Sequence, residues 1–203
     1  MTKGAATRDR ILARAEVIAS RDGLDALTIG VLAGELAMSK SGLFAHFLSK
    51  EGLQLAVLRR VVDRFNAHVL HPGLRAKPGE ARLRSLLDHW VAWGGARRAR
   101  GGDILTAAAF ELDDRPGLAR DFLVRSQRQW LRTVATAVQI AIEMRHFRDG
   151  VDVDQFVTDA HGIVLARHVA RRLLDDAKAE TRARAALDEL LARARRPARR
   201  RAA

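Results

Sequence analysis

The sequence predicts an all-α protein, and three observations lead to that prediction. Apolar residues recur at the 3.6-residue period of a helix in nearly every segment between turns. Most of these segments begin after a Thr, Ser or Asp that can cap a helix, and end near Gly or Pro. No segment alternates polar and apolar residues as a strand would, and no internal repeat occurs. At 203 residues, the chain has room for a small helical unit and a larger one.

The first helix is predicted over residues 7–23. Thr7 can cap its start, and Gly23 can end it in the left-handed conformation that glycine adopts easily. Its buried face is predicted from residues that recur with helical period: Ile11, Leu12, Ala15, Ile18 and Ala19. This helix would support the segment that follows it.

Residues 28–53 are predicted to form two short helices at a sharp turn and the start of a third. Thr28, Ser39 and Ser49 can each accept a hydrogen bond from the N–H groups of a first helical turn. The helices that they cap are predicted over 29–36, over about 40–46 and from Lys50 onward, with a turn at 37–38. Three helix N-termini would then lie close together, with N–H groups and positive dipole ends that suit phosphate oxygens. This helix-turn-helix pattern predicts contact with DNA, although Thr28 and Ser39 could be caps alone.

The second short helix is predicted to turn Leu43 and Phe47 inward. The residues left outside are Lys40, Ser41, Phe44, Ala45 and His46. Taken alone, His46 would more often be an ordinary surface histidine. Lys50 is a stronger candidate for DNA contact, because a lysine at a helix start opposes the helix dipole and needs another reason to be there.

The remaining helices follow in order, each bounded by caps and breakers. They are predicted over 51–69, stopped near 71–73; over 80–96, after Pro78-Gly79; over 104–112, capped by Asp103; over 118–145, after the turn 113–117; over 154–174, capped by Asp152 or Asp154; and over 179–194. A basic Gly-Gly break is predicted at 94–102 and a loop at 146–151.

In its first quarter the chain resembles the tetracycline-repressor (TetR) family of one-component regulators. The resemblance covers roughly residues 7–55 and rests on the order and spacing of Arg10-Ile11-Leu12, Gly23, Leu27-Thr28, Leu32-Ala33, Met38-Ser39-Lys40, Leu43-Phe44, His46-Phe47, Lys50-Glu51 and Leu53. It implies that the phosphate backbone is held by Thr28, Phe44, His46 and Lys50. It implies that the residues in or beside the major groove are Lys40, Ser41, Gly42 and Ala45. Phosphate contacts would position the protein and base contacts would specify the sequence.

Three departures from the family pattern affect the predicted interface. Ala37 stands where the family usually has glycine, and a positive φ there would cost about 1 kcal/mol because of its Cβ. Ser41-Gly42 replaces the common Gly-Thr order, so the base preference cannot be transferred. Phe44 replaces the usual tyrosine, and can press on a sugar or a thymine methyl but cannot donate a hydrogen bond to a phosphate.

Composition agrees with a cytoplasmic regulator in two parts. The formal net charge of +12 suits a polyanionic partner. Half of that excess is a terminal run without acids, namely Arg193, Arg195, Arg196, Arg199, Arg200 and Arg201. We predict a DNA-binding domain over 1–50, a sensing and dimerisation domain over 51–195, and a disordered basic tail over 196–203. No cysteine, signal peptide or membrane span is present in the sequence, so no disulfide, thiolate metal site or membrane partner is expected.

The last two helices carry a candidate homodimer interface. Gly162, Ala166 and Ala170 recur four residues apart, so one stripe lacks bulk and lets another helix approach closely. Leu187 and Leu190 add apolar surface on the last helix. Packing inside one subunit is the alternative. The family resemblance implies a four-helix interface from the last two helices of each subunit, and a dimer would match a palindromic operator.

The middle helices hold bulky aromatic residues that could line a ligand cavity or fill a core. The candidates for a pocket, polar groups included, are His89, Trp90, Trp93, Phe110, Gln127, Trp130 and His161. The resemblance implies a small, largely apolar effector whose binding changes the separation of the two DNA-binding heads. It does not identify the molecule.

An enzyme is not predicted, and neither a metal nor a cofactor is expected. The sequence lacks the His-Glu-x-x-His, phosphate-loop and Gly-x-Ser-x-Gly motifs. One Glu-x-x-His pair, Glu143 with His146, is too little for a carboxylate-bridged metal site. The favoured interpretation is a dimeric, ligand-responsive repressor that binds double-stranded DNA. An activator, or an architectural DNA-binding protein without a sensor, remains the alternative.

Overall fold

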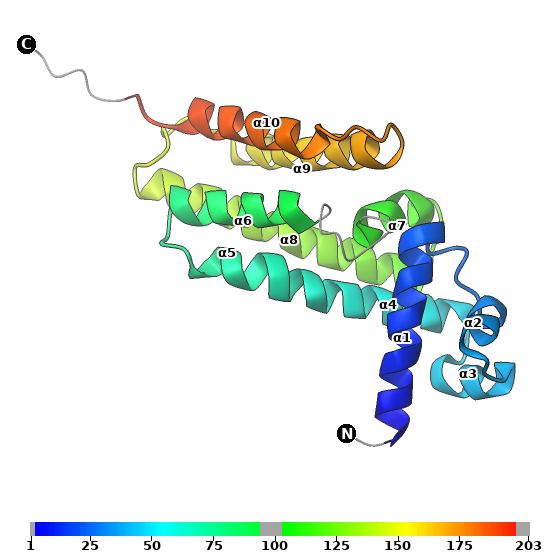
Figure 1. Ribbon diagram of the computed structural model, residues 1–203. Helices are drawn as coiled ribbons and strands as arrows, with labels where there is room; N and C mark the ends of the chain where they lie inside the picture. Colours follow the sequence, from blue (N-terminus) through cyan, green and yellow to red (C-terminus); the bar gives the residue numbers. More distant parts are fainter. Residues whose placement is uncertain (1–2, 94–102, 198–203) are drawn as a thin grey trace, which may run out of the picture. The chain divides into compact units, whose positions relative to one another are not determined.

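The computed structural model describes residues 3–93 and 103–197, and the predicted all-α fold is confirmed (Figure 1). Within these ranges the only bridge between extended segments pairs Phe147 with Arg195. The described chain divides into two compact units. One comprises 1–66 and 94–128, and the other comprises 67–93 and 129–203. The described part of the chain contains no helix long and apolar enough to cross a membrane.

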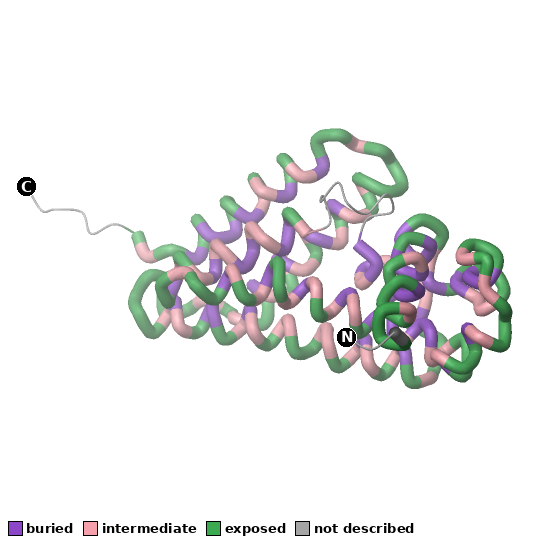
Figure 2. Tube along the Cα trace, turned by 60° about the horizontal axis from the view of Figure 1, so that its bottom comes forward, coloured by how far each residue is buried: buried purple, intermediate pink, exposed green. Residues whose placement is uncertain are grey.

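The first unit contains the helix-turn-helix and the segment around residue 110. Its helices are α1 (Lys3–Asp22), α2 (Ile29–Leu36), α3 (Lys40–Phe47), α4 (Lys50–Phe65), α7 (Ile104–Leu112) and the beginning of α8 (Leu118–Glu143). The buried stripe of each helix follows the predicted helical period, and Figure 2 shows these residues in purple. Side chains at the centre of this core are Ile11, Ile18, Leu27, Leu32, Leu43, Leu53 and Val57.

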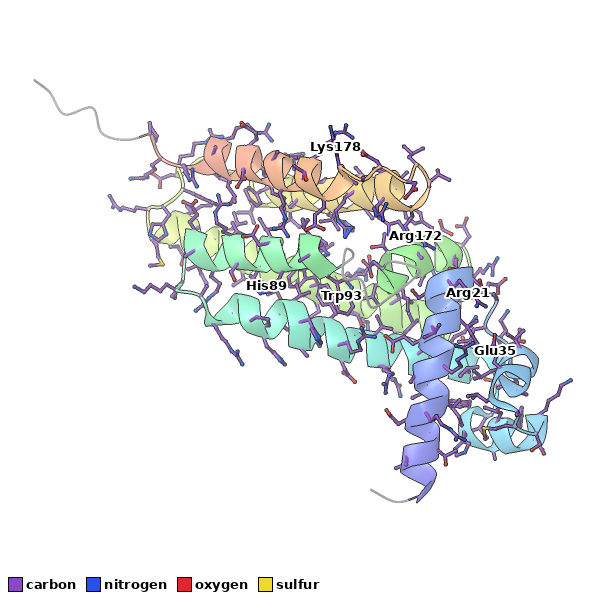
Figure 3. The ribbon with its side chains drawn as sticks, viewed as in Figure 1. Arg21, Glu35, His89, Trp93, Arg172 and Lys178 are labelled. Atoms are coloured by element: carbon purple, nitrogen blue, oxygen red, sulfur yellow. The ribbon has the colours of Figure 1, made fainter. Side chains whose placement is uncertain are left out.

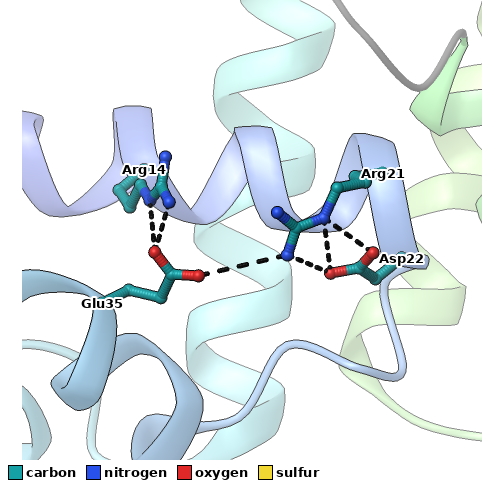
Figure 4. Close-up of polar contacts among 4 residues, drawn as sticks. All are labelled: Arg14, Arg21, Asp22 and Glu35. Atoms are coloured by element: carbon teal, nitrogen blue, oxygen red, sulfur yellow. Dashed lines mark hydrogen bonds and ion pairs between the residues drawn. The ribbon is translucent and has the colours of Figure 1, made fainter.

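Two glutamates connect α1 to its neighbours. Glu16 is buried, and its Oε2 accepts a hydrogen bond from Arg60 Nε of α4 at 3.2 Å. Glu35 of α2 accepts from Arg14 Nε at 3.1 Å, and its second oxygen lies 4.0 Å from Arg21 Nη2 (Figure 4). Because both carboxylates face arginines of another helix, they hold α1 against α4 and α2.

The second unit consists of α6 (Glu80–Trp93), most of α8, α9 (Val153–Arg172) and α10 (Ala179–Ala194), with the short helices η1 and α5 before them. Helices α9 and α10 lie side by side (Figure 1). Asp152 is the cap of α9, since its Oδ1 accepts from Gln155 N at 3.0 Å. The core includes Leu83, Leu86, Leu87, Val91, Val138, Phe156 and Val164.

The predicted helix stop at 71–73 is wrong. Residues Asn66–Leu70 form the π-helix η1, and His71–Arg75 form α5. Pro72 lies in the first turn of α5, directly after the π-helix. The wider π turn before it gives the proline ring room that a regular α-helical turn would not. Gly73 also has a packing role: a Cβ there would lie 2.4 Å from Leu86 Cδ2 and 3.1 Å from Leu86 Cα. Helix α5 therefore approaches α6 closely at this glycine.

The first two residues after α10 are held to the second unit. Arg195 Nε donates to Glu80 Oε1 at 2.8 Å, and Arg196 N donates to the carbonyl of His146 at 3.2 Å. Arg196, which is the first residue of the predicted tail, is thus part of the folded unit. The rest of that prediction, from residue 198 onward, lies outside the described residues, as do the predicted break at 94–102 and the end of the helix predicted to reach Ala96.

Candidate nucleic-acid interface

The three predicted caps begin α2, α3 and α4, and each accepts a hydrogen bond from its own helix. Val31 N donates to Thr28 Oγ1 at 3.1 Å, Gly42 N donates to Ser39 Oγ at 3.1 Å, and Gly52 N donates to Ser49 Oγ at 2.9 Å. Each cap pairs one backbone N–H group of the first turn, and other N–H groups of that turn remain for an incoming anion.

The start of α2 lies beside the start of α3, and the start of α4 lies beside the end of α3. A Cβ at Gly30, in the first turn of α2, would lie 3.8 Å from Lys40 Cε, which belongs to the first residue of α3. A Cβ at Gly52, in the first turn of α4, would lie 2.2 Å from the carbonyl oxygen of Phe47, the last residue of α3. The tight turn between α2 and α3 requires Ala37 at φ 50° and ψ 42°, the left-handed conformation expected at this position.

Helix α3 turns its predicted face outward. Leu43 is fully buried and Phe47 is 5 % exposed, whereas Phe44 is 52 % exposed. The other exposed residues of this face are Lys40, Ser41 and Ala45, with Gly42 and His46 half-buried beside them. Phe47 is covered by the guanidinium of Arg8, whose Cζ lies 5.1 Å from the ring centroid. The result is an exposed, weakly polar helix face with a cation at its first residue.

Lys50 is exposed at the start of α4, but it has a partner within the chain. Its Nζ donates to Asp25 Oδ1 at 2.7 Å, and Arg115 Nη1 lies 3.1 Å from the same oxygen. Hydrogen bonds from Lys50 and then Arg115 lower the pKa of Asp25 below its ordinary value, so this carboxyl is ionised at neutral pH. Sequence reasoning missed both partners, because no local pattern relates residue 25 to a turn ninety positions later.

The predicted pocket residues divide between the two units. In the second unit, Trp90 is 6 % exposed and meets Trp130 edge to face, with ring centroids 5.2 Å apart. His161 of α9 stacks on Trp90 at 5.8 Å. Burial lowers the pKa of His161, so its ring is neutral at pH 7. Phe110, which is 56 % exposed, and Gln127 belong to the first unit.

The end of α6 carries the two other predicted pocket residues, His89 and Trp93 (Figure 3). His89 Nδ1 lies 2.7 Å from the carbonyl oxygen of Ser85, one turn earlier on the same helix. Trp93 is half-buried, and its ring lies 6.1 Å from that of His68, a residue not singled out in the sequence. The second unit thus has an aromatic cluster of Trp90, Trp130 and His161, and a separate pair of Trp93 and His68.

The candidate dimer residues on α9 are exposed or half-buried, whereas those on α10 are buried. Gly162 and Ala166 are exposed on α9, and a Cβ at Gly162 would meet no atom within 4 Å. Ala170 is half-buried. Leu187 and Leu190 of α10 are 3 % and 4 % exposed, so in the single chain they pack into the core of their own unit. The exposed part of α9 continues to Val169 and Leu173, which are 40 % and 78 % exposed.

The one Glu-x-x-His pair has ordinary structural contacts. Glu80 N donates to His146 Nδ1 at 3.2 Å, which satisfies a backbone group at the start of α6. Glu143 Oε1 accepts from Gln139 Nε2 at 3.2 Å. Within residues 3–93 and 103–197, no group of three or more His, Asp or Glu side chains is arranged to hold a metal ion.

Two known families match most of the chain in sequence. Residues 11–57 match the tetR family of bacterial regulatory proteins, and residues 79–187 match the tetracyclin repressor-like C-terminal domain. No curated protein matches the chain significantly in sequence.

Solved structures share the fold over nearly the whole chain. A TetR transcriptional regulator from Chloroflexus aurantiacus J-10-FL is 24 % identical, covers 98 % of this chain and 100 % of its own, and superposes with a TM-score of 0.87. A transcriptional regulator from Saccharomonospora viridis in complex with choline is 22 % identical, with coverages of 93 % and 96 % and a TM-score of 0.77. AibR, in complex with isovaleryl coenzyme A and operator DNA, is 20 % identical, with coverages of 92 % and 98 % and a TM-score of 0.73.

Proposed function

The chain belongs to the tetR family of bacterial regulatory proteins, and on that premise we propose that it is a homodimeric repressor released from DNA by a small, largely apolar effector. It has the DNA-binding helix-turn-helix and the C-terminal domain of a TetR-family transcriptional regulator. The observation that supports the DNA-binding part of the proposal most strongly is the exposed face of α3, with the capped start of α2 beside its first residue and the capped start of α4 beside its last residue. Such a surface offers N–H groups and a cation to phosphates and a helix face to the major groove.

The proposed docking mode divides the exposed residues into two groups. The residues that would contact the phosphate backbone are Thr28, Ser39, His46 and Lys50, with Phe44 pressed on a sugar or a thymine methyl. The residues that would lie in the major groove are Lys40, Ser41, Gly42 and Ala45. Phosphate contacts carry affinity without sequence information, whereas base contacts carry specificity. The two groups can therefore be distinguished by substitution: the loss of DNA affinity should depend on salt for the first group and on the DNA sequence for the second.

Lys50→Ala should weaken binding to every duplex alike and reduce the slope of log affinity against log salt by about one. The relative preference among sequences should stay unchanged, because a phosphate contact carries no base information. Lys178→Ala is a matched control, since it removes the same charge from an exposed residue before α10 in the other unit. Fluorescence anisotropy of labelled duplexes over a range of NaCl concentrations measures both quantities. A loss confined to one operator sequence would contradict the assignment.

We propose that two copies of the chain pair through α9, with α10 behind it. Gly162 and Ala166 would let the two copies of α9 approach closely, and Val169 and Leu173 would gain burial. Leu187 and Leu190 would support the interface from within each subunit, because they are already buried there. A dimer presents two α3 helices, which suits an operator with two inverted half-sites.

We propose the second unit as the place where the effector acts. The cluster of Trp90, Trp130 and His161 offers aromatic surface and a neutral imidazole, which suits an uncharged or largely apolar molecule. Two neighbours in fold bind isovaleryl coenzyme A and choline.

Trp90→Ala and Trp93→Ala should have different consequences. Trp90 is nearly buried among other rings, so its loss should cost about 3–5 kcal/mol of stability and impair both DNA binding and sensing. Trp93 is half-buried and lies three residues, or about one helical turn, after Trp90 on α6, next to the proposed effector site. Its loss should therefore weaken the response to an effector while operator binding without effector stays nearly intact. Thermal melts and DNA titrations of both variants, with compounds that release the wild-type chain from DNA, test this. Equal destabilisation and joint loss in Trp93→Ala would mean that Trp93 belongs to the core.

A further inference from the structure

Asp25 is shared by two cations that come from different parts of the first unit. Lys50, at the start of α4, and Arg115, in the turn between α7 and α8, lie 2.7 Å and 3.1 Å from the same carboxylate oxygen. The three side chains are 43 %, 59 % and 55 % exposed for Lys50, Arg115 and Asp25, so an incoming phosphate can reach them. The cluster carries one net positive charge.

Backbone hydrogen bonds hold the parts of this cluster in place. The carboxylate of Glu111 accepts from Leu24 N at 3.1 Å and from Asp25 N at 2.8 Å. Glu51 Oε1 accepts from Leu118 N, the first residue of α8, at 2.6 Å. These bonds fix residue 25 and the two ends of the turn 113–117, so the shared contact does not depend on long flexible side chains alone.

The arrangement raises a question about Lys50 as a DNA contact. A lysine paired only with an aspartate would have to leave a carboxylate behind when it moved to a phosphate. That carboxylate would then face the polyanion without a partner, and its repulsion would oppose binding. A second cation on the same oxygen removes this obstacle.

We propose that Arg115 is a positioning residue for DNA binding, because it keeps Asp25 paired when Lys50 moves from Asp25 to a phosphate. The inference rests on the proposed function, in which Lys50 contacts the DNA backbone. In the free protein, the ion pair with Asp25 keeps the Lys50 side chain at the start of α4. In the complex with DNA, Asp25 is paired with Arg115 alone. The turn between α7 and α8 thereby contributes to DNA binding without touching DNA.

Binding of a mixed-sequence duplex of 20 base pairs tests this, measured at several NaCl concentrations. Arg115→Gln should weaken binding roughly two- to fivefold at low salt, the size expected of one exposed ion pair. The same change should have no effect in a chain that already carries Asp25→Asn. Asp25→Asn alone should tighten binding, and Arg115→Lys should retain most of the wild-type affinity. Thermal melts should stay near wild type, because all three side chains are exposed.

Arg120→Gln is the matched control for charge. Arg120 lines the same cleft of about 270 Å³, but its Nε donates to the carbonyl of Asp113 at 2.9 Å. It should therefore leave affinity nearly unchanged, and an equal loss in Arg120→Gln would overturn the proposal in favour of overall charge.

Two further results would overturn the inference while leaving the proposed function standing. One is an Arg115→Gln variant that binds as tightly as wild type. The other is an Arg115→Gln change that lowers DNA affinity by the same factor in the wild-type chain and in the chain with Asp25→Asn. That result would mean that Arg115 contacts DNA itself. Failure of the proposed function looks different: Lys50→Ala would then leave both affinity and salt slope unchanged.

Discussion

Gly52→Ala is expected to destabilise the first unit by about 1–3 kcal/mol, because the added methyl group has no room. Its Cβ would lie 2.2 Å from the carbonyl oxygen of Phe47, and a backbone atom at the end of α3 cannot rotate away as a side chain would. The gain of up to about 1 kcal/mol that alanine brings to a helix over glycine is too small to offset this. Displacing α3 from α4 would also separate the capped helix starts, so DNA binding should fall with stability.

Gly34→Ala provides the control for this prediction. Gly34 is exposed within α2, and a Cβ there would meet no atom within 4 Å, so the same change should raise stability slightly. Chemical denaturation of both variants, followed by circular dichroism, compares them directly. A Gly52→Ala variant as stable as Gly34→Ala would show that α3 and α4 are not packed as described.

Gly162→Leu and Ala166→Leu should weaken the dimer by an overpacking cost of roughly 1–3 kcal/mol, or about 5- to 150-fold in its dissociation constant. A Cβ at Gly162 would meet no atom of its own subunit within 4 Å, and Gly162 is exposed, so the fold of the single chain should survive the change. Any loss of the dimer would therefore report contact with a second copy. Operator affinity should fall with dimer content, because one head alone reads only half of a palindrome.

Ala81→Leu is the matched control, since Ala81 is an exposed alanine on α6, a different helix of the same unit. Sedimentation velocity over a range of protein concentrations should show weaker dimers for the two α9 variants and an unchanged dimer for Ala81→Leu. Undisturbed dimers of both α9 variants would move the interface elsewhere on the subunit.

Local features of the fold could be predicted from the sequence because short-range rules govern them. The hydroxyl residues Thr28, Ser39 and Ser49 cap the helices that they precede, and Ala37 takes the left-handed conformation of the turn. Each of these depends on residues within three or four positions. The inward and outward faces of α3 also follow from period, because Leu43 and Phe47 lie four positions apart on one face, whereas Phe44, although apolar, falls on the other face and is exposed.

Features that depend on distant contacts could not be predicted in this way. Period showed that Leu187 and Leu190 share an apolar face, but not that this face packs within its own unit. The pairing of Asp25 with Arg115 requires α7 and its turn to lie beside the helix-turn-helix, which no spacing in the sequence indicates. The aromatic residues of the middle helices likewise looked like one set, whereas Phe110 and Trp90 belong to different units.

The central claim is that a dimer reads a palindromic operator with two copies of α3, and selection from randomised duplexes tests it most directly. Purified chain would be incubated with duplexes that carry a long random segment, and the bound fraction would be amplified and sequenced over several rounds. We expect enrichment of one inverted repeat, with half-sites separated by about one helical turn or a multiple of it, and two chains or a multiple of two per duplex. Enrichment of an asymmetric site bound by a single chain, or no enrichment beyond salt-sensitive nonspecific binding, would contradict it.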